Sequence, residues 1–525
     1  MSTSDELSGA EEASSTLSST STSEGEGSSK LRTPPTCKDR LLLGHRKIYI
    51  VVVSAGLAQA SAAVCQTFVL GPLQGELWGK DMAQLGAWFG IVINIVAFLT
   101  GGSFGRLSDK IDRRVACCAF FVGSFLPAIS LVVMGLTNRG LWVACASRIL
   151  GAVVVAANVP MALLQDVSPF EHREVATGIF FALTNGLTVL LNGVPAVLIT
   201  ILKVVNIGAF EMLLFSLILA GLALVGLAML GSVRTDPDRP SESRTHAEDP
   251  DRRGGCRAAF LDPLILIWKH SRLRPLCASA FLMSWAGTII MCTSGQYYND
   301  ALGLLPYGLP SEFAMVSVLQ TLPGQLLVIP GYWITGSLSK SKGSLFLLRI
   351  LIPITALLML PGIVMAFAPF MWILPVVVIA LNYTGLPQVP LFRMIAGVAP
   401  PGRMGEALSA AGITMQAAGL VSNLMIALTS SRVQNIPMKS PLWVFYPLAA
   451  VLQFCAVLPL LGNPRHGHWG AAAGVVEDQV MATIYAAVFG LRWLRKSQER
   501  SPHLQEASSS TEASADETNA AEARV

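Results

Sequence analysis

The chain has 525 residues, of which 52% are hydrophobic and 13% are charged, and it has a mean hydropathy of +0.56 and a net charge of +4. Soluble domains carry about a quarter of charged residues, so this composition excludes an ordinary soluble protein and predicts a multi-pass membrane protein. The basic residues flank apolar segments and form no continuous stripe, so we expect no nucleic-acid partner. The nine cysteines are scattered, and we expect no metal, no cofactor and no disulfide framework.

The first segment, residues 1–44, is rich in Ser, Thr and Glu and has almost no large apolar residues before the basic cluster near its end. Such a composition does not offset the entropy lost on ordering, so it predicts a disordered cytoplasmic tail. The start of this segment has no apolar core, so we expect no cleavable signal peptide.

Apolar runs of about 20 residues, the length that spans a bilayer as a helix, follow this tail. Six runs fill a first half, residues 45–231, and six more fill a second half, residues 275–463. A polar connection rich in Arg and Asp, residues 232–274, separates the halves. The predicted spans are 48–70, 82–104, 115–136, 141–164, 176–201, 209–231, 275–297, 313–335, 345–367, 370–392, 407–429 and 442–462. The fold class we predict is therefore an all-α membrane protein with twelve transmembrane helices in two six-helix halves.

Lys and Arg are concentrated in alternate connections between these runs, and the positive-inside rule then places both termini in the cytoplasm. The last segment, residues 464–525, becomes a second cytoplasmic tail. Within it, apolar residues at helical spacing predict an amphipathic helix at about 475–496. This helix could lie on the inner membrane face or pack on the protein's own loops, and the sequence favours neither.

The connection after the second apolar run reads GRLSDKIDRR, from Gly105 to Arg114. It resembles the loop between the second and third helices of major facilitator superfamily transporters, whose usual pattern is GxLxDRxGRR. Asp112 stands where that pattern has glycine. The resemblance implies an inner gate in which a small residue lets two helix ends approach while an acid and several bases form an ionic latch. The residues carried over to this gate are Gly105, Asp109, Lys110, Arg113 and Arg114. A plain alternative is that any short cytoplasmic loop carries such charges.

The two halves show traces of an internal duplication. Gly105 and Gly336 differ by 231 residues, and the second half reads GSLSKSKG where the first reads GRLSDKID. The same offset relates Asn192 to Asn423, so duplication explains the matches better than chance does. Lys340 replaces the acid Asp109, so we expect the first latch to matter more.

The connection DVSPFEHREVATG, from Asp166 to Gly178, is similar to the segment after the fourth helix of tetracycline-resistance-like and hippocampus-abundant-transcript-like proteins. This resemblance implies roles for Asp166 and Arg173. Arg148 matches an arginine in the fourth helix of proton-coupled drug antiporters of that kind. Those antiporters place an acid in the first helix, whereas this chain has Gln59 in the corresponding region, which favours facilitated diffusion or coupling through peripheral carboxylates.

Polar side chains in membrane-spanning helices usually face the bundle interior or a water-filled path. Several of them recur one heptad apart in the first, fifth and eleventh predicted helices, which border the central cavity in the resembled family. The alternative is that these amides hold helices together. The predicted substrate path consists of Gln59, Gln66, Arg148, Asn185, Asn192, Gln296, Tyr383, Gln388, Gln416 and Asn423.

These features favour a secondary active or facilitative transporter of a small organic solute, working by alternating access as a monomer, with protons as a candidate coupling ion. A non-transporting receptor or scaffold with the same fold is the alternative. No catalytic set or phosphate loop indicates an enzyme. We expect an integral membrane protein of the plasma membrane or of an organelle, and the sequence does not distinguish the two.

Overall fold

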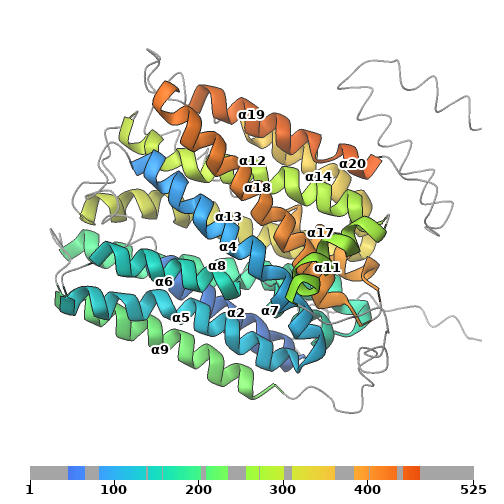
Figure 1. Ribbon diagram of the computed structural model, residues 1–525, viewed down its shortest axis with the longest axis horizontal. Coiled ribbons are helices and arrows are strands. Elements are labelled where there is room, and N and C mark those ends of the chain that lie inside the picture. The colour runs from blue at the N-terminus through green and yellow to red at the C-terminus, as the bar shows by residue number, and fades with distance from the viewer. Residues whose placement is uncertain are drawn as a thin grey trace, which may run out of the picture.

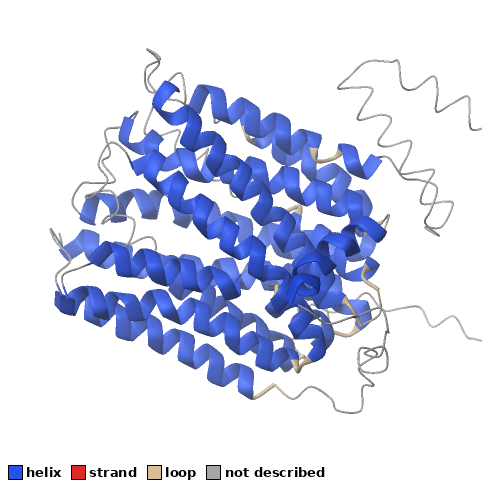
Figure 2. Cartoon of the chain, viewed as in Figure 1, coloured by secondary structure: helices blue, strands red, loops and turns tan. Residues whose placement is uncertain are grey.

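The computed structural model describes residues 45–65, 82–137, 140–155, 158–202, 209–233, 256–270, 272–300, 310–360, 383–400, 402–433 and 442–461. In these ranges every regular element is a helix, as Figure 2 shows, which agrees with the all-α prediction. The expected tail at 1–44, the expected amphipathic helix at 475–496 and Gln66 lie outside the described residues.

The helices lie side by side in one bundle (Figure 1). The first group is α2 (Arg46–Cys65), α4 (Met82–Lys110), α5 (Arg113–Thr137), α6 (Gly140–Val155), α7 (Val159–Val167), the short 3-10 helix η3 (Phe170–His172), α8 (Arg173–Leu202) and α9 (Ala209–Gly231). The second group is α11 (Cys256–Lys269), α12 (Leu273–Asp300), α13 (Pro310–Lys342), α14 (Ser344–Leu358), α17 (Gln388–Val398), α18 (Met404–Val433), α19 (Leu442–Cys455) and α20 (Leu458–Leu461).

Five of the described helical segments are long and apolar enough to cross a membrane. They are Gln84–Lys110, Arg113–Ser130, Phe170–Leu191, Leu273–Cys292 and Met404–Thr429. The twelve spans therefore stay a prediction.

Several features differ from the sequence-based expectation. Residues 105–110, predicted as part of a loop, belong to α4, and the predicted span 442–462 is divided between α19 and α20. The predicted span 141–164 is divided between α6 and α7, and α7 begins after Asn158 with a proline, Pro160, in its first turn. Proline lacks the N–H that would continue a preceding helix and suits the start of a new one. The connection 232–274, interpreted only as a polar loop, contains the helix α11.

The two groups of helices meet along two seams, α4 against α18 and α8 against α13. We call the end of the bundle at which residues 105–114 lie the latch end. It is on the right in Figure 1, where α7, α11 and α17 gather. Its apolar core draws on both groups, because Ile48 of α2, Leu164 of α7, Leu391 of α17 and Leu408 of α18 belong to one fully buried cluster.

At the latch end each seam depends on glycine. A Cβ added to Gly105 of α4 would lie 2.8 Å from the carbonyl oxygen of Gly405 in α18, and would also collide with the Ser409 side chain. A Cβ added to Gly336 of α13 would lie 2.9 Å from the carbonyl oxygen of Glu174 in α8. Only a residue without a side chain lets the two backbones approach this closely.

The two seams are related contact by contact. Adding 231 to Gly105 gives Gly336, and subtracting 231 from Gly405 gives Glu174, whose carbonyl oxygen stands at the equivalent place. Subtracting 231 from Ser409 gives Gly178, the other neighbour of Gly336, with its Cα 3.0 Å from the added Cβ. The offset found in the sequence therefore also relates the seams in space, as duplication of an ancestral half predicts.

We expect Gly336→Ala to lower the stability of the protein by about 1–3 kcal/mol, the usual cost of overpacking. The new methyl group would press on backbone atoms of α8, which have no rotamer to change. The change is measured as a lower Tm of the purified protein in detergent. Gly287→Ala in α12 is the matched control, because its added Cβ meets no atom of the structure within 4 Å and alanine favours helix. An equal fall in Tm for both variants would contradict this account of the seam.

Candidate functional site

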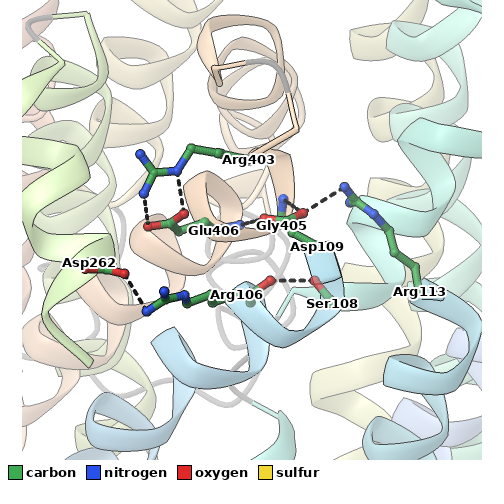
Figure 3. A network of polar contacts seen from close by, with 9 residues as sticks. Arg106, Ser108, Asp109, Arg113, Asp262, Arg403, Gly405 and Glu406 are labelled. Atoms are coloured by element: carbon green, nitrogen blue, oxygen red, sulfur yellow. Dashed lines mark hydrogen bonds and ion pairs between the residues drawn. The ribbon is translucent and has the colours of Figure 1, made fainter. Parts of the chain in front are cut away.

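Asp109 lies in the last turn of α4 and joins α4 to α18. Its Oδ1 accepts a hydrogen bond from the backbone N–H of Gly405 at 2.9 Å, and its Oδ2 accepts one from the backbone N–H of Glu406 at 2.8 Å (Figure 3). The first N–H groups of a helix have no partner within the helix, and the helix dipole favours an anion beside them. The Asp109 side chain is 3% exposed, so this cap, supplied by the opposite half, is shielded from water.

Arg113, at the start of α5, holds the Asp109 carboxylate from the other side. Its Nη2 lies 2.9 Å from Asp109 Oδ1, and its Nε lies 2.7 Å from Asp166 Oδ2 on α7. One guanidinium thus links two carboxylates. The structure brings Gly105, Asp109 and Arg113 of the predicted latch together at the start of α18 and α5. A buried carboxylate with a cation and two backbone donors is well compensated for the loss of water.

The other two predicted latch residues do not reach the seam. Lys110 is exposed. Arg114 forms an ion pair with Asp112 in the same turn, and its Nη1 donates to the carbonyl oxygen of Val233 at 3.0 Å. Asp112, which replaces the glycine of the family pattern, therefore pairs with Arg114 and also accepts from its backbone N–H.

The second seam has different chemistry at the equivalent place. Lys340 stands where the 231 offset puts the counterpart of Asp109, and its Nζ lies 3.3 Å from Nδ1 of His172 in η3. A cation cannot accept from the N–H groups at the start of α8, and the helix dipole there disfavours it. The two halves are instead joined by an ion pair, at 2.8 Å, between Arg393 of α17 and Glu174 of α8.

The predicted residue Arg173 lies next to this second contact. Its guanidinium carbon is 5.4 Å from the ring centroid of Phe170, and the guanidinium carbon of Arg393 is 5.5 Å from the same centroid. Arg173 and Arg393 therefore share one aromatic ring at the latch end, an arrangement in which the ring quadrupole offsets part of their mutual repulsion.

Sequence reasoning missed two further ion pairs beside the first seam. Arg106 of α4 pairs with Asp262 of α11 at 2.6 Å. Arg403 donates to the Glu406 carboxylate of α18 from Nε at 2.8 Å and from Nη2 at 3.0 Å (Figure 3). Arg403 and Glu406 are three residues apart at a helix start, a spacing that could have suggested a pair. Arg106 occupies a variable place in the motif, so no motif position identified it.

The residues predicted to line a substrate path are spread along the bundle. Arg148 of α6 has its guanidinium carbon 5.4 Å from the ring centroid of Phe89 on α4. Asn185 donates to the carbonyl oxygen of Phe181 in its own helix at 2.7 Å, and the Tyr383 hydroxyl donates to the carbonyl oxygen of Leu327 at 3.0 Å.

The remaining path residues also occupy different surroundings. Gln59 is exposed, and Gln388 and Gln416 are half-buried. Asn192 and Gln296 lie in α8 and α12, but their side chains are outside the described part of the structure.

Asn423 is buried in the first seam. Its side chain lies against Gly90 of α4, where an added Cβ would be 2.8 Å from Nδ2, and its Oδ1 accepts from Cys292 Sγ at 3.3 Å. A residue that sequence analysis did not identify, Asn94 of α4, lies in the same way against Gly419 of α18. In these two places the amides fill the space over a glycine of the opposite helix, as in helix packing.

Comparison with known proteins gives the wider context of this geometry. A family model described as Major Facilitator Superfamily matches residues 55–423. A search of curated proteins found no match.

The chain is also similar to several solved structures. One is a proton:xylose symporter bound to 6-bromo-6-deoxy-D-glucose, with a TM-score of 0.58 and 14% identity over 80% of this chain and 95% of that chain. Another is the E. coli fucose:proton symporter, with a TM-score of 0.56 and 11% identity over 78% of this chain and 97% of that chain. A third is the human organic anion transporter TETRAN, with a TM-score of 0.51 and 15% identity over 82% of this chain and 100% of that chain.

At these identities the structural matches show a shared fold, and the family match covers more than half of the chain. The family and the matched structures are transporters and not enzymes. The chain therefore belongs to the major facilitator superfamily and is an integral, multi-pass membrane protein.

Proposed function

We propose that this protein is a secondary transporter that moves a small organic solute by alternating access between two six-helix halves. In this proposal twelve helices cross the membrane and the latch end, with both termini, faces the cytoplasm. Exposed basic side chains at the latch end support this orientation through the positive-inside rule. They include Lys110, Lys269, Arg272, Arg274, Lys340 and Lys342.

The observation that carries the proposal is the bond between Asp109 and the start of α18. It joins the two halves through polar groups at the end of the bundle where alternating access requires them to separate. A hydrogen bond to a charged group contributes a net free energy of about 1.5–3 kcal/mol to the closed contact. The value is this modest because water replaces the lost partner when the contact opens. A contact of this strength holds a gate shut and still lets it open.

For the solute path we favour Arg148 with the amide and hydroxyl groups of Asn185, Tyr383, Gln388 and Gln416. A guanidinium binds carboxylate and phosphate groups with paired hydrogen bonds, so we propose an organic anion as the first solute class to test. The narrower kinship with tetracycline-resistance-like and hippocampus-abundant-transcript-like proteins is part of the same proposal. Asp109 and Asp166, which pair with Arg113 at the latch end, are the candidates that we favour for proton coupling.

The test is uptake by the purified protein in sealed liposomes, with pooled organic acids, sugars, amino acids and organic cations, each with and without an imposed pH gradient. Saturable uptake of one class, with organic acids expected first, supports the proposal. Accumulation that follows the pH gradient indicates proton coupling, and equilibration that ignores it indicates facilitated diffusion. Absence of flux for every class, in protein that is folded by its Tm, would instead favour the receptor or scaffold.

Asp109→Asn should weaken closure of the latch end while leaving the fold intact. The amide keeps the shape but loses the charge that the N-terminus of α18 and Arg113 stabilise. We expect a loss of about 1.5–3 kcal/mol of closure and a lower uptake rate. Closure is followed by the distance between spin labels at Ser232→Cys and Ser341→Cys, two exposed serines at the latch end in opposite halves, in a variant whose natural cysteines are replaced.

Asp112→Asn is the matched control for Asp109→Asn, because Asp112 pairs with Arg114 of its own half. It should leave the distribution of label distances unchanged. Equal distance changes in both variants would show that the loop charge as a whole matters, and not the bond to α18.

Arg148→Ala should raise KM about tenfold or more, since losing one charge-assisted contact costs about 1.5–3 kcal/mol. Arg148→Lys keeps the charge without the planar fork, so we expect an intermediate KM. Phe89→Leu removes the ring beside the guanidinium and leaves the charge of Arg148 in place, so we expect only a small change in KM. The measurement is the concentration dependence of uptake. An unchanged KM in Arg148→Ala would remove this residue from the path.

A further inference from the structure

Helix α11 is the one described helix of the connection between the halves, and it lies across the first seam. It contacts both α4 and α18 at the latch end. Pro263 and Leu266 are buried, with Leu266 only 2% exposed, whereas Ile265 and Lys269 on other faces are exposed. A passive linker has no need to bury side chains against both of the helices that form a gate.

The contact of α11 with α4 is an ion pair removed from water. The side chains of Arg106 and Asp262 are 7% and 20% exposed, and their charged atoms lie 2.6 Å apart. Arg106 is three residues before Asp109 on α4, so the ion pair lies about one helical turn from the bond that joins the halves. A buried arginine that loses its counter-charge is strongly destabilising until water reaches it.

On the α18 side, Glu406 is 1% exposed and is bound by Arg403. The backbone N–H of this same Glu406 donates to Asp109. Figure 3 shows Asp262 and Arg106 beside Arg403 and Glu406, so two cations and two carboxylates from α4, α11 and α18 gather where the three helices meet.

The tethers of α11 decide which contact must break when the latch end opens. Only residues 270–272 separate α11 from α12, a reach of about 10 Å, so α11 must stay with the second half. Residues 232–255 separate α11 from α9 of the first half, and a connection of this length allows the two helices to move apart. Movement of α4 away from α18 therefore separates Arg106 from Asp262.

We propose that α11 is a clamp on the latch end, in which Asp262 positions Arg106 and so stabilises the state with α4 and α18 together. The inference rests on the proposed alternating access and adds a regulatory element to it. Any influence that displaces α11, or that neutralises Asp262, would speed the opening of this end. The pair acts from outside the seam, since the glycine contacts and the Asp109 bond do not involve α11.

The test uses the full-length protein in lipid nanodiscs with spin labels at Ser232→Cys and Ser341→Cys. Asp262→Asn should raise the population of the longer distance on the order of tenfold, because Arg106 loses its counter-charge only in the closed state. Asp262→Glu keeps the charge, so its distribution of label distances should stay close to that of the parent protein. Lys269→Gln, an exposed charge on the same helix, should change nothing.

The outcomes separate the clamp from the proposed function. If Asp109→Asn lengthens the distance and Asp262→Asn does not, the clamp is wrong and the rocking motion stands. If neither variant changes a single narrow distance, the alternating-access proposal itself fails. Should Asp262→Asn not yield folded protein, Arg106→Gln removes the same pair from the α4 side, and an unchanged distance in that variant overturns the clamp.

Discussion

The structure of the latch end depends on one interaction, the capping of α18 by a carboxylate that belongs to the opposite half. The free N–H groups at a helix start need an acceptor, and Asp109 supplies two oxygen atoms for them. The neighbouring residues make this geometry possible. Gly105 lets α4 approach α18 so closely that an added Cβ would lie 2.8 Å from the carbonyl oxygen of Gly405. Arg113 holds the carboxylate and also pairs with Asp166.

The duplicated seam shows what happens when that acid is missing. Backbone contacts at Gly178 and Gly336 repeat those of the first seam, so the shape of the crossing survives without the carboxylate. The cap on the helix start does not survive, because Lys340 cannot accept from an N–H group and lies beside His172 instead. The ring of Phe181, stacked at 5.6 Å on Tyr332, adds an apolar contact across α8 and α13. The first seam is therefore closed by a carboxylate on a helix start, and the second by close backbones, aromatic packing and the Arg393–Glu174 ion pair.

The sequence predicted the elements that local pattern specifies, and it missed those that depend on distant partners. The apolar runs, the latch motif and the 231 offset can be read directly from the sequence. The structure relates the two seams by that offset, while the bounds of several described helices differ from the predicted spans. The acceptor role of Asp109 depends on backbone groups almost 300 residues away, which leave no trace in residue type. Helix α11 was missed because a run of 14 residues containing Pro263 is too short to span a bilayer and includes a residue that usually breaks helices. Asn423 has the same heptad spacing whether an amide lines a path or packs on a glycine, so periodicity alone could not separate these roles.

A gate built from charges and glycines has a thermodynamic consequence. Separating apolar surfaces in water costs about 25 cal/mol for each Å² exposed. The buried cluster that both groups share at the latch end adds this cost to opening. The charged groups at the latch end regain hydration as water enters, so much of the Coulombic attraction lost on opening is returned as solvation. In the proposed transport cycle, small changes of partner among these charged groups would shift the populations of the closed and open forms. An ion pair such as Arg106 with Asp262, placed on a helix tethered to one half, is therefore well suited to adjust that balance without taking part in the seam itself.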